Sequence, residues 1–154
     1  MTPAIELARK AGIRHCVHEY QHDPGAASYG LEAADKLGLP PERVFKTLVA
    51  ALATGELVVA VVPVAAMVNM KKLAKAAGAK KAAMAEAKAV ERSSGYVLGG
   101  VSPLGQKKAL RSFIDDSAAD LSSIYVSAGR RGLEIELAAD DLLSLCRGCY
   151  APLC

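Results

Sequence analysis

Two apolar segments separated by a short turn place the strongest constraint on how this chain can fold. The first, RVFKTLVA, covers residues 43–50, and the second, LVVAVVPV, covers residues 57–64. Both are rich in the β-branched and apolar residues that favour strands. The sequence ATGE at 53–56 between them is typical of a turn. Because strands joined by so short a connection pair with each other, we predict an antiparallel hairpin.

Helical and strand-like segments surround this hairpin without a steady alternation. Helices are expected at 2–12, 30–38 and 69–78. A fourth helix is expected to end near Gly95, and a fifth is expected at 139–146. Strands are expected at 14–20 and 95–105, a strand followed by an acidic turn within 109–118, and a second hairpin over 122–129 and 131–138. This mixed order predicts an α+β fold with a mixed, largely antiparallel sheet.

The length of 154 residues is that of one domain, which we place at 1–154, with about 145–154 as a tolerant tail. The longest apolar run, LVVAVVPVAAMV, has twelve residues and a proline, too few to cross a bilayer. The first residues, MTPAIELARKAG, lack the apolar core of a secretory signal. We therefore expect a cytoplasmic protein that does not associate with membranes.

The formal net charge is +3, and the basic residues are clustered. The clusters are Lys71, Lys72, Lys75, Lys80 and Lys81; Lys107, Lys108 and Arg111; and Arg130 with Arg131. Each cluster by itself is typical of a solvated helix face or loop end. Three clusters together favour a partner that carries phosphate groups.

Lys46 lies in the middle of the first apolar segment. Because side chains alternate between the faces of a strand, Lys46 shares a face with Val44, Leu48 and Ala50, and Thr47 points to the other face. One interpretation is an edge strand, with the ammonium group reaching water along its apolar stem. The other is a cleft in which the ammonium group meets an anion, since a partly buried lysine is costly without a partner.

The stretch GYVLGGVSPLG at 95–105 is unusually rich in glycine for a strand. Glycines inside a strand mark a bulge or a place where another group approaches the backbone closely. Gly99, Gly100 and Ser102 would expose backbone N–H groups and a hydroxyl, which suit a carbonyl oxygen or a phosphate. A simple glycine-rich turn is the alternative interpretation.

The cysteines and histidines give weak signals. CRGC at 146–149 has the spacing of a metal or redox pair but no second pair or nearby histidine. Cys16 and His18 lie on one face of an expected strand and are conceivable as nucleophile and base. We expect neither pair to act, and we expect no metal site.

Four stretches together resemble the YbaK/EbsC family: EYQHDP at 19–24, VFKTLV at 44–49, GYVLGGVSPLG at 95–105 and IYVSAGRRGLEIEL at 124–137. The likeness is greatest to its YbaK branch, the Cys-tRNA(Pro) deacylases, and it covers nearly the whole chain. The resemblance implies a mixed sheet curled into a partial barrel and flanked by helices. It also implies no metal and no organic cofactor.

The activity implied by this resemblance is removal of cysteine from mischarged tRNA(Pro). The partners implied are the acceptor end of aminoacyl-tRNA and prolyl-tRNA synthetase in a transient complex. In the YbaK branch the substrate thiol is believed to attack its own ester and leave as a thiolactone. Such an intramolecular step needs positioning and oxyanion stabilisation rather than a side-chain nucleophile.

The resemblance also implies the site residues. Lys46 would contact the terminal nucleotide or the ester, and its role would be electrostatic. The other residues implied as substrate contacts are Tyr20, Tyr29, Thr47, Gly99, Gly100, Ser102 and Glu134. Glu134 would face the substrate amine where some relatives carry aspartate, and Tyr29 stands where phenylalanine is frequent. The longer glutamate could change the size of the pocket and with it the preference for cysteine.

Three functions of different classes follow from these observations. The first is a deacylase for Cys-tRNA(Pro), with alanine as an alternative amino acid. The second is a non-catalytic module that binds aminoacyl-tRNA or a synthetase, because no conventional catalytic group is evident. The third is a thiol-regulated or metal-binding protein based on Cys146 and Cys149.

Overall fold

The structure, a computed structural model, describes residues 1–26 and 28–154, apart from the side chain of Tyr29. Two sheets form its framework. The antiparallel three-stranded sheet has the order β1 (His15–Glu19), β7 (Leu133–Leu137), β6 (Ile124–Arg130). The five-stranded sheet has the order β4 (Ala82–Met84), β2 (Phe45–Leu52), β3 (Leu57–Pro63), β5 (Arg111–Asp115), β8 (Cys149–Ala151).

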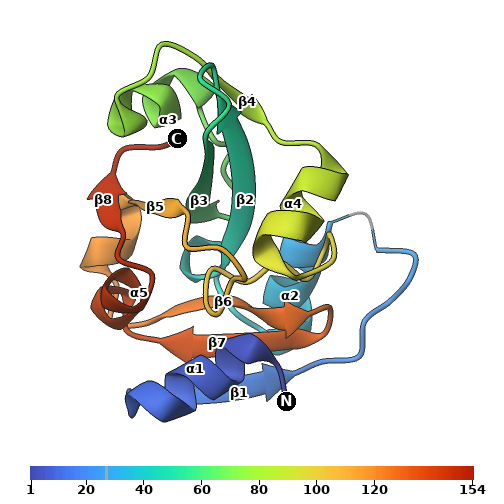
Figure 1. Cartoon of the computed structure of the whole chain (residues 1–154). Helices are drawn as coiled ribbons and strands as arrows, with labels where there is room; N and C mark the ends of the chain where they lie inside the picture. Colours follow the sequence, from blue (N-terminus) through green and yellow to red (C-terminus); the bar gives the residue numbers. More distant parts are fainter. Residues whose placement is uncertain (27) are drawn as a thin grey trace.

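Helices flank both sheets, as the α+β prediction requires. They are α1 (Pro3–Ala11), α2 (Tyr29–Leu37), α3 (Met70–Ala77), α4 (Ala87–Ser94) and α5 (Ala139–Leu145), with short 3₁₀ turns at Pro41–Arg43 and Asp116–Asp120. Figure 1 shows α1 beside the three-stranded sheet at one end of the molecule and α3 with β4 at the other end. None of the helices described is long and apolar enough to cross a membrane.

Both predicted hairpins are confirmed. β2 pairs antiparallel with β3, with Thr47 opposite Val61, and β6 pairs antiparallel with β7, with Ser127 opposite Glu134. The five-stranded sheet is mixed, because β5 runs parallel to β3 and β8 runs parallel to β5. The expected single sheet is thus divided into two, which a parallel bridge between Val44 and Tyr125 joins.

The β2–β3 hairpin is central because it is covered on both faces. Phe45, Val49 and Val61 pack in one apolar cluster with residues of the three-stranded sheet such as Val126 and Ile135. Side chains on the opposite face of the hairpin, including Ala50, Val58 and Val62, pack in a second cluster. That cluster also contains Leu73 of α3 and Leu153. Burial on both faces explains why the β3 sequence is almost continuously apolar.

The predicted helix starts are confirmed by their caps. The side chains of Thr2, Ser28 and Asn69 accept hydrogen bonds from the first-turn backbone N–H groups of α1, α2 and α3. These helices end at Gly12, Gly38 and Gly78, each with a positive φ that favours glycine. Ser28 and Gly30, at the start of α2, also line the pocket described below.

Three segments differ from the sequence-based expectations. Residues 95–105 form turns and loop rather than a strand, and 82–84 form the short edge strand β4. The third is the C-terminal segment, expected as a tolerant tail. Its residues 149–151 form β8, Leu153 is fully buried, and the N–H of Leu153 donates to Asp115 Oδ1 over 2.9 Å.

Candidate functional site

A pocket of about 450 Å³ opens between β2, the 95–105 loop and the β6–β7 hairpin. Its volume lies within the range of small-molecule sites, roughly 300–1,000 Å³. Five of the eight residues expected at the site line it: Tyr20, Lys46, Thr47, Gly99 and Glu134. Segments from positions 20 to 134 are therefore brought together by the packing of the two sheets.

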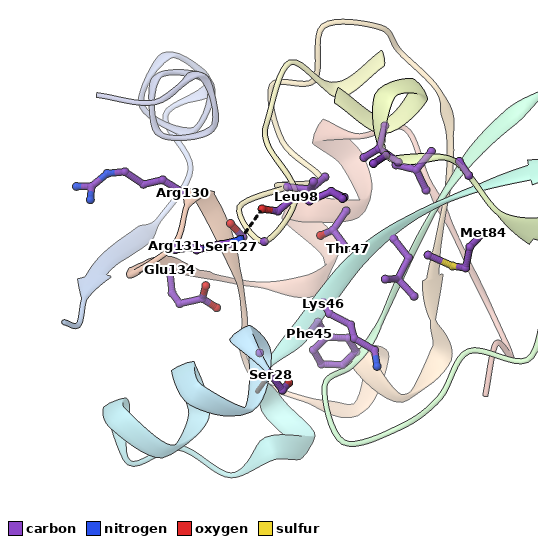
Figure 2. Close-up of a pocket in the computed structure, with 18 of the residues that line it drawn as sticks. Ser28, Phe45, Lys46, Thr47, Met84, Leu98, Ser127, Arg130, Arg131 and Glu134 are labelled. Atoms are coloured by element: carbon purple, nitrogen blue, oxygen red, sulfur yellow. Dashed lines mark hydrogen bonds between the residues drawn. The ribbon is translucent and has the colours of Figure 1, made fainter. Parts of the chain in front are cut away.

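Strand β2 separates the two polar residues that it contributes. Thr47 lies on the face of Phe45 and Val49, toward the three-stranded sheet, whereas Lys46 lies on the face of Leu48, toward α3. Figure 2 shows the hydroxyl of Thr47 turned toward Ser127 and the ammonium group of Lys46 pointing away from that hydroxyl. The Thr47 hydroxyl and the Lys46 ammonium group would therefore contact different parts of a ligand.

The hydroxyl of Thr47 is buried, and no described residue forms a hydrogen bond with it. Leaving a buried hydroxyl without a partner costs about 1–3 kcal/mol. Thr47 thus contributes to the pocket wall a hydroxyl whose hydrogen-bonding capacity is unused. A carbonyl or alkoxide oxygen of a ligand would satisfy it.

Glu134 contributes a carboxyl group that is almost fully buried, with 7% of the residue exposed. Within the described part of the chain it has no hydrogen bond or ion pair. Burial raises the pKa of Glu134 to about 8, so the free protein at neutral pH holds mostly the uncharged acid. Figure 2 shows this side chain directed into the space between β7 and β2, where its deprotonated form would pair with a positively charged ligand group.

Tyr20 is held at the pocket by its own backbone. Its N–H donates to the carbonyl oxygen of Gly132 over 3.0 Å. A Cβ atom at Gly132 would lie 2.7 Å from the carbonyl oxygen of Tyr20, and φ there is +84°, so glycine permits this close approach. Burial and the neighbouring charge of Glu134 raise the pKa of the Tyr20 phenol, which keeps it a neutral wall.

The glycine-rich loop at 95–105 contributes Leu98 and Gly99 to the pocket. Gly100 instead packs against β6, where a Cβ atom would lie 2.8 Å from Cα of Arg130. Ser102 is fully buried inside the loop, and its hydroxyl accepts the N–H of Leu104 over 3.2 Å. The structure therefore places Gly100 and Ser102 behind the pocket wall, whereas the family resemblance predicts them at the ligand.

One expected contact cannot be placed, and several others were missed. The side chain of Tyr29 lies outside the described residues. Ser127, Met84 and Leu98 line the pocket without having been singled out. Arg131, which also lines it, donates to the carbonyl oxygen of Leu98 over 3.3 Å and so ties the loop to the hairpin. The sequence signal that could have identified Arg131 as a pocket residue is its position between two glycines in the motif IYVSAGRRG.

The weaker candidates lie elsewhere. His18 contacts Glu136, with 3.1 Å between Nε2 and Oε1, rather than Cys16, and all four cysteines are free. Among the described residues, no group of three His, Cys, Asp or Glu side chains could hold a metal ion. The described wall of the pocket contains no cysteine and no histidine. It offers hydroxyls, a carboxyl and an ammonium group.

Comparison with known proteins decides the family. The aminoacyl-tRNA editing domain matches residues 23–145, most of the chain. This chain belongs to that family. A relative in Enterococcus faecalis, named as the Cys-tRNA(Pro)/Cys-tRNA(Cys) deacylase EbsC, is 44% identical over 120 residues, which cover 78% of this chain and 73% of that protein.

Solved structures share the fold of this editing domain. A crystal structure of the hypothetical protein APE2540 superposes with a TM-score of 0.87 at 22% identity and covers 98% of each chain. A crystal structure described as a trans-editing enzyme for prolyl tRNA synthetase gives 0.80 at 20% identity, over 97% of this chain and 91% of that one. The predicted YbaK-like α+β fold is thereby confirmed.

Proposed function

We propose that this editing domain is a free-standing deacylase that clears Cys-tRNA(Pro) by cleaving the ester between cysteine and the tRNA 3′ end. The 44% identical relative named for that activity supports the reaction and the substrate. Prolyl-tRNA synthetase needs such a partner because binding discriminates poorly between side chains of similar size. Aminoacylation takes place in the cytoplasm, where we place the protein.

The observation that carries the chemistry is a pocket with polar groups but without a described cysteine or histidine. In the proposed step the substrate thiol supplies the nucleophile. Its sulfur forms a bond to the ester carbonyl carbon, the bond from that carbon to the ribose oxygen breaks, and the thiol proton ends on that oxygen. The products are a cyclic thiolactone and a tRNA with a free 3′ end. An intramolecular attack of this kind gains most from correct orientation.

The pocket residues fit three roles in this step. Thr47 would donate its unpartnered hydroxyl to the oxyanion that develops on the carbonyl oxygen. Glu134 would lose its proton and pair with the α-ammonium group of the substrate. Lys46, which has no hydrogen bond or ion pair to a described residue, would hold a phosphate of the terminal nucleotide. Tyr20 would close the pocket behind the amino acid.

The direct test is release of labelled cysteine from Cys-tRNA(Pro) by the purified protein, with and without prolyl-tRNA synthetase. We expect release in both assays, and faster release with the synthetase if the two form a transient complex. Absence of release in both would overturn the proposed function. The variant Lys46→Ala is expected to lose release while keeping the circular dichroism spectrum of the parent.

Two further substrates separate the alternatives. Ser-tRNA(Pro), which lacks the thiol, should bind without being cleaved. If Ala-tRNA(Pro) is cleaved as fast as Cys-tRNA(Pro), the substrate thiol is not the nucleophile and alanine becomes the substrate class. If all three are bound and none is cleaved, the protein is a binding module.

A further inference from the structure

The largest concentration of positive charge lies outside the pocket, on α3 and the segment that leads to β4. Lys71, Lys75, Lys80 and Lys81 line a groove of about 710 Å³, which we call the lysine groove. All four side chains are exposed, and no Asp or Glu occurs between residues 57 and 85. Their sequence pattern fits either a solvated helix face or a surface that meets phosphate groups.

The four ammonium groups have no hydrogen bond or ion pair to any described residue. Some other cations of the described chain are paired: Arg111 forms two hydrogen bonds with Glu56, and Lys36 lies 3.6 Å from Glu32. Like charges gathered without counter-charges repel one another and create a positive potential over the groove. Such a surface attracts a polyanion.

The lysine groove and the pocket both border the short edge strand β4. Ala82 lines the groove and Met84 lines the pocket, and only Ala83 lies between them on this strand. On the face of β2 toward α3, burial and Asp115 raise the pKa of the Cys154 thiol, and the ammonium groups of Lys46 and Lys72 both oppose that rise. Lys46 of the pocket therefore lies on the side of α3, next to the helix that carries Lys71 and Lys75. Figure 1 shows β4, α3 and the C-terminus at the same end of the molecule.

This arrangement leads to an assignment that rests on the proposed function. We propose that the lysine groove binds the phosphates of the tRNA acceptor stem whose aminoacylated 3′ end occupies the pocket. A ligand anchored in the pocket by its last nucleotide would pass Lys46 and follow β4 to the groove. Phosphate contacts of this kind fix position and orientation without reading sequence.

The test uses a charge reversal in the groove and a matched one elsewhere. Lys80→Glu/Lys81→Glu alters two exposed residues outside the helices, and Lys10→Glu/Arg14→Glu makes the same change of charge near α1, at the other end of the molecule. Binding of uncharged tRNA(Pro) is measured for both variants over a range of salt concentrations. We expect the groove variant to bind at least about tenfold more weakly, and the slope of log K against log salt to fall by about 1–2.

Kinetics with two substrates tests the placement of the stem. With Cys-tRNA(Pro), the groove variant should show a raised KM and an unchanged kcat. With a cysteinyl-CCA trinucleotide, which has no stem, it should match the parent protein, and this match also shows that the pocket is intact. The neutral variant Lys80→Gln/Lys81→Gln should give a smaller change in the same direction.

The outcomes separate this proposal from the proposed function. If the parent protein releases no cysteine, the proposed function fails. If it releases cysteine and the groove and α1 variants behave alike, the lysine groove is not the stem site, while the proposed function stands. If only stimulation by the synthetase is lost and tRNA binding is unchanged, the groove is a protein-binding surface, and our assignment is overturned.

Discussion

At the scale of single residues, the pocket holds polar groups in states that cost stability in the free protein. The hydroxyl of Thr47 is buried without a described partner, and the carboxyl of Glu134 is held in an apolar setting. A ligand that offers an acceptor to the first and a cation to the second would remove both costs. A site prepared in this way stabilises charge that develops during a reaction better than water does.

Replacing Thr47 with valine tests the first of these groups. Thr47→Val keeps the shape and removes the hydroxyl, so we expect kcat for cysteine release to fall roughly 100-fold. The free energy of unfolding should rise by roughly 1 kcal/mol, because an unsatisfied buried hydroxyl is lost. Thr47→Ser is the control and should keep activity within a few-fold. Wild-type kinetics in the valine variant would remove Thr47 from the mechanism.

The titration of Glu134 predicts a pH dependence of stability. Its pKa in the folded protein is about 8, above the ordinary value of 4.5. Between these values the folded state keeps a proton that the unfolded state has lost, so stability falls as pH rises through this interval, by up to about 1.4 kcal/mol per pH unit, and levels off above it. Urea unfolding of the parent protein and of Glu134→Gln from pH 5 to 9 measures this difference. Parallel curves for the two proteins would contradict it.

At the scale of elements, the C-terminal segment forms a strand because it pairs with a neighbouring strand, although its own sequence does not predict one. A stretch with three cysteines and no clear periodicity was expected to be tolerant. In the structure β8 adds a parallel strand next to β5, and Leu153 packs against the cluster that includes Leu73 of α3. A three-residue strand is specified by its neighbours rather than by its own pattern.

This packing predicts a large loss of stability at one position and almost none at the next. Leu153→Ala empties a fully buried site and should lower the free energy of unfolding by about 2–5 kcal/mol. Cys154→Ser changes an exposed side chain and should shift it by less than about 0.5 kcal/mol. Urea denaturation measures both. If the two variants unfold alike, the segment is a tolerant tail as the sequence suggested.

At the scale of the whole molecule, the two sheets share one core. The largest apolar cluster combines Phe45, Val49 and Val61 with Val126, Ile135 and further residues of both sheets. The pocket lies at this junction, since Thr47 belongs to one sheet and Glu134 to the other. The site therefore exists only when both sheets are folded and packed.

A shared core predicts a single cooperative unfolding transition. Amide hydrogen exchange should give similar opening free energies for the interiors of β3 and β6, which lie in different sheets. Urea unfolding followed by circular dichroism and by tyrosine fluorescence should give coincident curves. Earlier exchange throughout β6 and β7, with β3 still protected, would show that the three-stranded sheet unfolds independently.

Much of the fold follows from local sequence signals. The caps at Thr2, Ser28 and Asn69 fix helix starts, and the alternation and turns of the two hairpins fix their pairing. The interval 95–105 was misassigned because its glycines were interpreted as a bulged strand, whereas they allow a loop to lie against the backbone of β6. β4 was missed because its sequence, AAM, has no strand pattern, and only its pairing with β2 makes it a strand.

By itself the sequence determined the two hairpins, the helix limits, the family and five of the residues that line the pocket, because these depend on local pattern and on motif identity. Only the tertiary structure decided that Thr47 lines the pocket without a described hydrogen-bond partner, that Gly100 and Ser102 lie behind the pocket wall, and that the lysine groove and the pocket both border β4. Burial, close backbone approach and the continuity of a surface depend on which segments pack together. A residue's local sequence does not show which distant residues it contacts. Those contacts are set by the packing of the two sheets.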